Sequence, residues 1–392
     1  MKIVYVSTRI PYPPTTGDRL LMYNRAVEMS QDNSLDLIAI YQKEAELEAL
    51  DDISHLFENI FTIKMSRFAG LTNILKNYFF CNDPFQVMFF NSRSMRARIK
   101  SIVDLGDYDV VNAYLIRTLP LVNVVGTPVV LDLIDSMQLN FLNRINKATN
   151  WAKACFYKLE YLRLVKYERV FHEGIKDIIF VSERDQDNLY SNSKVIPLGV
   201  NTDSFYPSKF KNNQIIFSGN MSYEPNIQAV LWFVENCFDT IQEVNQDVVF
   251  IVAGRDPSLK IRSLACDRII VTGYVDSIAD LVSESMVAIV PMTSGSGMQN
   301  KLLEAMACGV TVVATSYGVG DVKVTDMKEV LISDSVLGFS THVINVLSNP
   351  DHYRKIAHNG RMFVIDNHSW KAHAHALSKV YRNVLESASN LR

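Results

Sequence analysis

The chain has 392 residues, of which 48% are apolar and 21% are charged, and its formal net charge is -3. This length exceeds what one hydrophobic core usually fills, so two domains are expected, and the composition excludes disordered and collagen-like chains. A net charge near zero gives no global basic field, so we do not expect nucleic acid as a partner.

The N-terminal residues and the spacing of the cysteines indicate the cellular compartment of the protein. The apolar run after Met1 ends at Arg9 and Pro11, which is too short for the core of a signal peptide. No uninterrupted apolar segment reaches the roughly 20 residues of a membrane-spanning helix. The five cysteines lie far apart, without the spacing of a zinc site or a disulfide framework. These features predict a cytoplasmic protein, either free or peripheral at the inner face of the cytoplasmic membrane.

Short runs rich in β-branched residues alternate with longer mixed segments in the first half of the chain. The runs cover residues 2–8, 36–41, 110–114, 128–134 and 178–181. Because they do not alternate with polar residues, they are typical of parallel strands covered by helices on both faces. The sequence therefore predicts a Rossmann-like, doubly wound α/β domain over 1–205.

A polar stretch at 207–213 indicates a linker, and a second series of the same kind follows it. Its expected strands cover residues 214–218, 248–253, 268–272, 287–291 and 311–315. The second Rossmann-like domain is expected over 206–370. Two such α/β domains are expected to face each other across a cleft, with ligands at the carboxyl ends of the strands.

The strand expected at 287–291 leads into Met-Thr-Ser-Gly-Ser-Gly-Met-Gln-Asn-Lys-Leu-Leu-Glu. Gly295 and Gly297 allow a close backbone approach, and the free amides of the first helical turn favour a phosphate. Lys301 and Glu304 are three residues apart on one helix face. We expect Lys301 to neutralise phosphate charge and Glu304 to accept hydrogen bonds from ribose hydroxyls. A surface ion pair beside an ordinary glycine turn is the alternative interpretation.

The segment from Gly297 to Gly309, followed by Val-Thr-Val-Val-Ala-Thr, resembles the donor-site helix of glycosyltransferase family 4. The segment 195–207 is similar to that family's interdomain segment, and Val-Thr-Gly-Tyr-Val-Asp at 271–276 is similar to its base-binding loop. Arg-Ile-Pro-Tyr-Pro-Pro-Thr-Thr-Gly-Asp-Arg at 9–19 resembles a bacterial branch that builds exopolysaccharide and capsule.

The resemblance implies the GT-B fold, in which the first domain binds the acceptor and the second binds the donor. The donor would be a UDP- or GDP-sugar, the acceptor a saccharide that is free or polyprenyl-linked, and the anomeric configuration would be retained. The final helix, 371–392, would return to the first domain. Lys301 and Glu304 would be the catalytic pair. The implied donor-binding residues are Gly17, Arg19, Asn220, Arg255, Tyr274, Val275, Gly295, Ser296, Gly297, Met298, Gln299, Asn300, Lys301 and Glu304.

Two departures from the family pattern leave other functions open. Ser296 stands eight positions before Glu304, where the family usually has a second acidic residue, and the usual Arg and Lys pair is missing from 218–226. A degenerate nucleotide-sugar-binding subunit is therefore one alternative. A sugar-nucleotide epimerase of the same architecture is another, although the acidic and histidine chemistry it needs is not found.

Acidic residues elsewhere give weaker predictions. Asp132 and Asp135 end an expected strand and are interpreted as acceptor-binding residues, with capping as the alternative. The Asp-x-Asp pairs at 107/109 and 185/187 are poorly positioned for a metal-diphosphate site. We therefore expect no metal and no other cofactor.

The segment 139–173 carries seven Lys or Arg against three Glu, interleaved with Trp151, Phe156 and other apolar residues. One interpretation is a basic amphipathic surface that contacts the inner membrane and its lipid-linked acceptor. The other is the solvated face of long core helices. The sequence leaves both open.

Overall fold

The computed structural model describes residues 1–146, 148, 150–171, 175, 177–183, 193–294 and 300–389. The chain divides into two compact units, which we call unit 1 (Met1–Leu198 with His373–Arg392) and unit 2 (Gly199–Ala372). The sequence placed these boundaries at 205/206 and 370/371. The first boundary lies earlier in the structure because Val200 and Phe205 already pack into the core of unit 2.

Unit 1 contains a seven-stranded parallel sheet in the order β3-β2-β1-β4-β5-β6-β7. Its strands are β1 (Lys2–Ser7), β2 (Ser34–Tyr41), β3 (Asn59–Lys64), β4 (Val110–Tyr114), β5 (Val129–Ile134), β6 (Ile178–Phe180) and β7 (Lys194–Val195). Its helices are α1 (Gly17–Met29), η1 (Glu44–Leu50), η2 (Ser54–Leu56), α2 (Arg67–Tyr78), α3 (Phe85–Phe90), α4 (Arg93–Gly106), η3 (Ile116–Thr118), α5 (Leu119–Val122), α6 (Met137–Asn146), α7 (Trp151–Phe171) and most of α16 (Trp370–Ser389).

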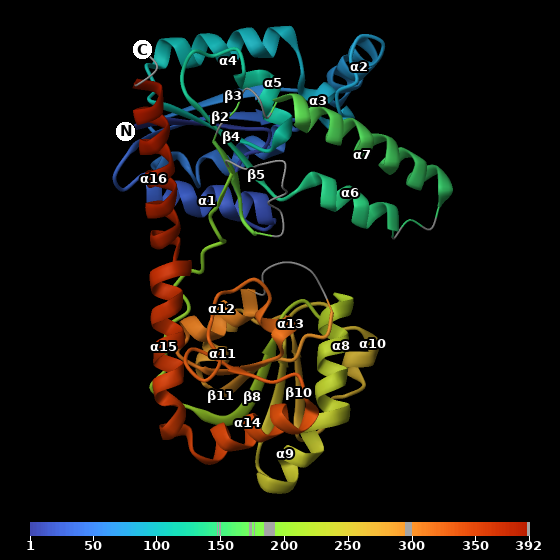
Figure 1. The fold of residues 1–392 in the computed structure, drawn as a ribbon, viewed down its shortest axis with the longest axis vertical. Coiled ribbons are helices and arrows are strands. Elements are labelled where there is room, and N and C mark those ends of the chain that lie inside the picture. The colour runs from blue at the N-terminus through green and yellow to red at the C-terminus, as the bar shows by residue number, and fades with distance from the viewer. Residues whose placement is uncertain are drawn as a thin grey trace. The chain divides into compact units, whose positions relative to one another are not determined.

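Alternate residues of β1 face opposite sides of this sheet. Val4 and Val6 join the core cluster that contains Met95 and Ile99 of α4, whereas Tyr5 points to the side of α1. The ribbon shows α4 on one face of the sheet and α1 on the other (Figure 1). Both faces are covered, which explains why the strands carry continuous apolar runs.

The α1 side of the sheet buries a polar cluster. Arg25 of α1 and Asp132 of β5 form an ion pair with both side chains fully buried. The Nε of Arg25 donates to Nε2 of His373 on α16 at 2.7 Å, and Nδ1 of His373 lies 2.6 Å from the carbonyl oxygen of Pro197. The rings of Tyr5 and Tyr114 meet edge-on with their centres 5.3 Å apart, and Tyr381 of α16 is fully buried. This cluster joins α16 to the rest of unit 1.

Replacing His373 with glutamine is expected to weaken the dependence of stability on acid pH. Burial, and secondarily Arg25, hold the pKa of His373 well below its ordinary value of 6.5. Below that value the unfolded state binds more protons than the folded state, so stability falls as the pH falls, by at most about 1.4 kcal/mol per pH unit. Urea unfolding at several pH values should give a shallower slope for His373→Gln. The exposed neighbour His375 provides the control, since His375→Gln should keep the wild-type slope; equal slopes for all three proteins would contradict the expectation.

Unit 2 contains a six-stranded parallel sheet in the order β10-β9-β8-β11-β12-β13. Its strands are β8 (Asn212–Ser218), β9 (Val249–Ala253), β10 (Ile269–Gly273), β11 (Ser285–Val290), β12 (Thr311–Ala314) and β13 (Leu331–Ile332). Its helices are α8 (Glu224–Phe233), η4 (Val234–Phe238), α9 (Asp239–Val244), α10 (Leu259–Arg262), α11 (Ile278–Ser283), α12 (Asn300–Ala307), α13 (Ser316–Val319), α14 (Val336–Ser348) and α15 (Pro350–His368).

All ten expected strands are present, with ends that differ by at most two residues. Three further strands, β3, β7 and β13, were not predicted from the sequence. In each sheet the strand order reverses next to the first strand of the unit, between β1 and β4 and between β8 and β11. The carboxyl ends of strands at such a reversal form the usual ligand-binding edge of a doubly wound sheet. Within the described part of the chain, no helix has the length and hydropathy that a membrane span requires.

Candidate donor site

Lys301 lies at the reversal of strand order in unit 2. Its ammonium group is 5.4 Å from the ring centre of Phe217 near the end of β8, and 3.9 Å from the sulfur of Met292, just beyond β11. The side chain leaves α12 one residue after the helix begins at Asn300. The helix is oriented by Leu302, Leu303 and Met306, which are buried in the core. Lys301 and Glu304 are therefore held on the side of α12 away from that core.

Two glycines shape the loops beside Lys301. β8 pairs with β9 up to Ser218 and Ala253, so Gly219 and Gly254 follow at the same level. The Gly219 amide donates to the carbonyl of Ala253 at 2.9 Å, and a Cβ added at Gly254 would overlap the carbonyl oxygen of Gly219. Gly254 also has a φ of +141°, which side-chain-bearing residues rarely adopt. Only glycine lets these two loops approach so closely.

An open pocket of about 570 Å³ lies at the carboxyl ends of β8, β9 and β10, next to α12. This volume falls within the range of small-molecule sites. The lining residues are Phe205, Ser218, Gly219, Asn220, Gly254, Arg255, Tyr274, Val275, Ile278, Asn300 and Glu304. Six predicted donor-binding residues therefore line one pocket: Asn220, Arg255, Tyr274, Val275, Asn300 and Glu304.

The two charged residues of α12 have shifted pKa values. Burial lowers the pKa of Lys301 from 10.5 to about 8, although Glu304 acts in the opposite direction. Burial raises the pKa of Glu304, and Lys301 opposes that shift. A solvated surface ion pair, which was the alternative interpretation, would not be desolvated in this way. Instead, desolvation makes both groups sensitive to any charged ligand that enters the pocket.

The other loop side chains are more accessible. Tyr274 is 76% exposed, so its ring is open to stacking by a planar ligand. The guanidinium of Arg255 is mostly exposed and lies 3.8 Å from the Asp256 carboxylate. The side-chain amide of Asn226 donates to the carbonyl of Asn220 at 2.9 Å and fixes the loop after β8. The pocket thus combines a buried charged end with an exposed aromatic end.

The remaining predicted site residues lie elsewhere or outside the described part of the chain. Gly295, Ser296, Gly297, Met298 and Gln299, like Asp185 and Asp187, lie outside the described residues. Gly17 and Arg19 belong to unit 1, where Gly17 begins α1 and faces open space. The prediction that Asp132 binds the acceptor is wrong, because its carboxylate is fully buried and paired with Arg25. Asp135 is exposed.

Sequence reasoning missed five residues that line the pocket: Phe205, Ser218, Gly219, Gly254 and Ile278. A usable signal existed for two of them, because Gly219 and Gly254 each follow a predicted strand directly. A glycine in that place is typical of a loop that approaches a ligand or another backbone. For the other three, the sequence carries no signal that separates a lining residue from an ordinary core or loop residue.

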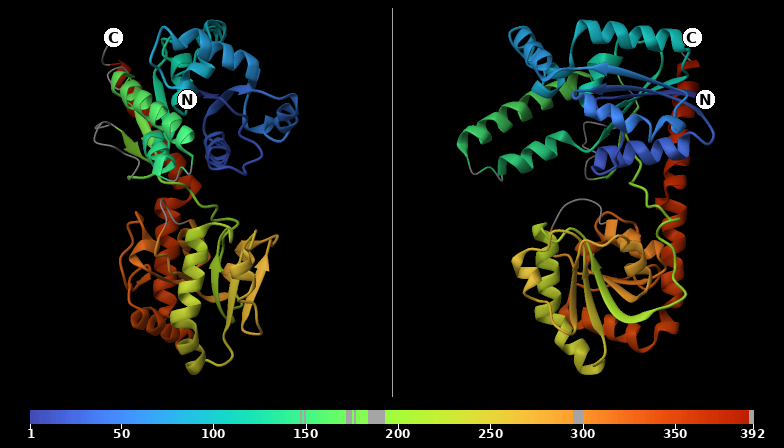
Figure 2. Two further views of the ribbon diagram at one scale, coloured as in Figure 1. Left: turned by 90° about the vertical axis from the view of Figure 1, so that its right-hand side faces the viewer. Right: turned by 180° about the vertical axis from the view of Figure 1, so that it is seen from behind.

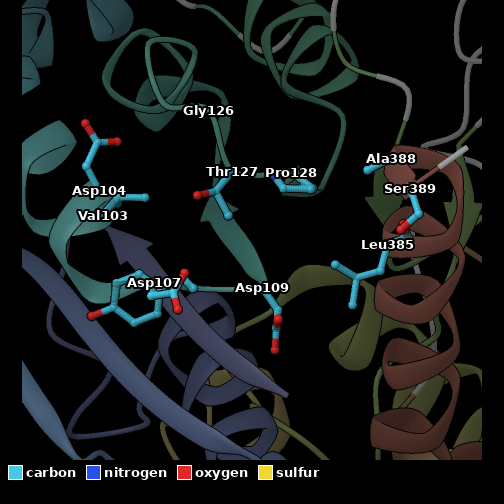
Figure 3. A pocket seen from close by; sticks show the side chains of 11 residues that line it. Val103, Asp104, Asp107, Asp109, Gly126, Thr127, Pro128, Leu385, Ala388 and Ser389 are labelled. Atoms are coloured by element: carbon cyan, nitrogen blue, oxygen red, sulfur yellow. The ribbon is translucent and has the colours of Figure 1, made fainter. Parts of the chain in front are cut away.

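A second pocket, of about 470 Å³, lies in unit 1 at the amino ends of β4 and β5. Figure 3 shows Thr127 and Pro128 at the start of β5 and Leu385 and Ser389 on α16. Two of its three carboxylates are engaged: Asp104 accepts from Lys100 and Asp109 from the Lys2 amide, both at 2.8 Å. Ligands of doubly wound sheets bind at the opposite edge, so this pocket is not the candidate site. No group of acidic, histidine or cysteine residues suited to a metal occurs among the residues that the structure describes.

Comparison with known proteins is consistent with this geometry. Residues 212–349, which contain the whole sheet of unit 2 and α12, match the family described as Glycosyl transferases group 1. An uncharacterised 44.6 kDa protein from the cps region of Klebsiella pneumoniae is 22% identical over 388 residues, which make up 94% of this chain and 97% of that protein. The similarity to that protein therefore extends over nearly the full length of both chains.

Solved structures give the same result for the whole fold. Anabaena HepE in complex with UDP has a TM-score of 0.64 and 14% identity, over 98% of this chain and 100% of HepE. A glycosyltransferase from Rickettsia africae has a TM-score of 0.65 and 15% identity, over 98% of both chains. HepE has also been solved in complex with UDP-glucose. The chain therefore has the GT-B fold, its residues 212–349 correspond to a Glycosyl transferases group 1 domain, and these findings support a glycosyltransferase.

Proposed function

We propose that the chain is a family 4 glycosyltransferase that takes a sugar from a nucleotide-sugar donor bound in the pocket of unit 2. The main support for this function is that Lys301 and Glu304 are both desolvated at the reversal of strand order, next to a pocket of about 570 Å³. A diphosphate carries negative charge that the Lys301 ammonium attracts, and a ribose has hydroxyl groups from which the Glu304 carboxylate can accept hydrogen bonds.

Each end of the pocket suits one part of a nucleotide. The exposed ring of Tyr274 and the neighbouring Val275 would contact the base, and Glu304 would hold the ribose. Lys301, with Arg255 and Asn220, would stabilise the negative charge on the departing diphosphate, which is the charge that develops in the transition state. The UDP bound in the HepE structure supports a nucleoside-diphosphate sugar, such as a UDP-sugar, as the donor.

The acceptor is proposed to be a saccharide, free or polyprenyl-linked, in the synthesis of a surface polysaccharide. The relative from a cps region supports this assignment. The reaction would retain the anomeric configuration, and the leaving phosphate would assist deprotonation of the acceptor, so no protein base is assigned. Asp135 stays a candidate for acceptor binding because it is exposed, unlike Asp132. We propose no metal requirement, so excess EDTA should leave the rate unchanged.

Nucleotide release from UDP-, GDP- and ADP-sugars, with a membrane-lipid extract as acceptor, tests the proposal. One donor should be turned over, and Glu304→Gln should lower its kcat/KM by about 10- to 100-fold, because a hydrogen bond to a charged group is lost. Glu243→Gln changes an exposed glutamate on α9 and should match the wild type.

Other outcomes would identify the alternatives. Binding of a donor without turnover of any donor would favour the degenerate binding subunit, in which Ser296 replaces the second acidic residue. Conversion of a nucleotide-sugar to its epimer, without release of nucleotide, would identify the epimerase. If no donor binds, the assignment of the pocket in unit 2 is wrong.

A further inference from the structure

Helix α2 presents its apolar side to solvent. Phe68, Leu71, Leu75 and Phe79 recur at spacings of three, four and four residues, which places them on one side of the helix. We call them the α2 stripe; they are 61–77% exposed, and Phe80 beyond them is 89% exposed. The opposite side of α2 carries small and polar residues and packs on α3. There, a Cβ added at Gly70 would overlap the Phe89 ring, and Asn73 donates to the Phe89 carbonyl at 3.1 Å.

This arrangement is the reverse of that in a helix covering a core, which buries its apolar side. Contiguous exposed apolar surface of this kind marks an interaction site rather than ordinary scatter of single residues.

A chain of aromatic contacts connects the α2 stripe to α7. Ring centres are 5.4 Å apart for Phe79 and Tyr78, 6.2 Å for Tyr78 and Phe85, and 5.6 Å for Phe85 and Phe156. From Phe156 the exposed apolar surface continues along α7 through Trp151, Leu159 and Leu162. Both figures of the ribbon show α7 lying beside α6 and extending beyond the edge of the sheet of unit 1 (Figures 1 and 2).

The exposed charges around this surface have one sign. Among the described residues of α2, α6 and α7, the only acidic residues are Glu160 and Glu168, and both are buried. Glu160 accepts from the amides of Phe85 and Gln86 at 2.8 and 3.2 Å, and Glu168 accepts from Gln138. The exposed charged residues on the three helices are all cationic: Arg67, Lys76, Arg144, Lys153, Lys158, Lys166 and Arg169.

We propose that the α2 stripe and the exposed side of α7 form a docking surface for an anionic lipid bilayer. Aromatic and aliphatic side chains would enter the boundary between headgroups and acyl chains, and the surrounding Lys and Arg would lie against anionic headgroups. A second copy of the chain is a poorer occupant, because two such surfaces would bring like charges together. The inference goes beyond the proposed reaction and does not depend on it.

Sedimentation of the full chain with lipid vesicles tests this surface. The protein should bind vesicles that contain phosphatidylglycerol far better than vesicles of phosphatidylcholine alone, and added salt should weaken that binding. The double change Leu71→Gln with Leu75→Gln, which we call the stripe variant, should lower the partition coefficient at least about tenfold, since apolar burial in the bilayer is lost. Lys153→Glu with Lys158→Glu should lower it by more than about fivefold for each cation removed.

Matched controls separate this surface from general effects. Leu105 and Leu337 are 85% and 78% exposed on α4 and α14, and their double change to Gln should bind as the wild type does. Lys260→Glu with Lys355→Glu controls for net charge, because both lysines are exposed on unit 2. Thermal unfolding should be unchanged in the stripe variant, because the changed side chains are exposed.

Three results would overturn the proposal: no binding of the wild type to anionic vesicles, equal binding by the stripe variant, or a wild-type dimer in analytical ultracentrifugation that the stripe variant dissociates. The last result would assign the surface to a second copy of the chain. Binding of soluble UDP- or GDP-sugars is measured separately and should be the same in the stripe variant and the wild type. A failure of the donor assignment is therefore distinguishable from a failure of the docking surface.

Discussion

Replacing Asp132 with alanine is expected to destabilise unit 1 by about 3–5 kcal/mol, because it leaves the Arg25 guanidinium buried without its carboxylate. Arg25 also donates to His373, so the loss should extend to the packing of α16 in unit 1. Urea unfolding, followed by circular dichroism, measures the change. The loss is large compared with the 5–15 kcal/mol that stabilises an ordinary domain.

Asp52 supplies the control, because it lies in the same unit and is exposed. Asp52→Ala should change the free energy of unfolding by no more than about 0.5 kcal/mol. Replacing both partners, as in Arg25→Met with Asp132→Leu, should recover much of the loss, since no buried charge then stays unpaired. If Asp132→Ala unfolds like Asp52→Ala, the two residues of the buried pair are not coupled as the structure indicates.

The case of Asp132 illustrates what a single sequence could not provide. A carboxylate at the end of a parallel strand is typical of a ligand site, and that pattern predicted an acceptor contact. The sequence could not reveal that Arg25, on a helix far away in the chain, folds back onto the same strand and neutralises the carboxylate. Local patterns give the position of a charged group, whereas its partner depends on tertiary packing.

The strands also include some that local sequence patterns predict and some that they do not. Continuous β-branched runs predicted the central strands of both sheets because burial on two faces demands such runs. β3 (Asn59–Lys64) lies at the edge of its sheet and has one buried residue, but its core Ile-Phe-Thr-Ile is rich in β-branched and aromatic residues and was a strand signal that went unused. β7 and β13 have two residues each, too few to carry a periodic pattern.

The donor site could be predicted in part. The loops after β8, β9 and β10 and the helix α12 followed from strand positions and from the resemblance, and six of those residues line one pocket. The approach of Gly254 to Gly219 could not be predicted, because it depends on how the ends of two strands are paired. The spacing of the α2 stripe was visible in the sequence, but such spacing usually indicates a buried side, and only the structure reveals that it faces outward.

The affinity for a nucleoside diphosphate is expected to depend on the protonation of Lys301. Its pKa in the free protein is about 8, well below 10.5, because burial disfavours the ammonium form. A diphosphate favours the ammonium form and would raise this pKa when it binds. Near pH 7 Lys301 is already protonated, so little proton is taken up. Near pH 9 most of it is neutral, so binding should take up close to one proton, and the affinity should fall toward about tenfold per pH unit.

Isothermal titration calorimetry in buffers of different ionisation enthalpy measures both quantities. Lys301→Met should bind UDP or GDP about 100-fold more weakly at pH 7, which is about 2.7 kcal/mol, and should take up no proton at this site. Lys301→Arg should retain more affinity than Lys301→Met and also lose the proton uptake, since a guanidinium stays charged. Lys355→Met, on the exposed side of α15, is the control and should behave as the wild type does.

Lys301 is expected to lower the stability of the folded chain, although it increases the affinity for the nucleotide. Since the pKa of Lys301 is lower in the folded than in the unfolded chain, the unfolded state binds more protons between about pH 8 and 10.5, and the wild type gains stability as the pH rises through that range. Lys301→Met removes the buried charge, so at pH 7 it should be more stable than the wild type, by about 0.5–2 kcal/mol, while binding the nucleotide less well. A variant that loses both stability and affinity would instead indicate that Lys301 supports the fold of unit 2, and its assignment to the diphosphate would fail.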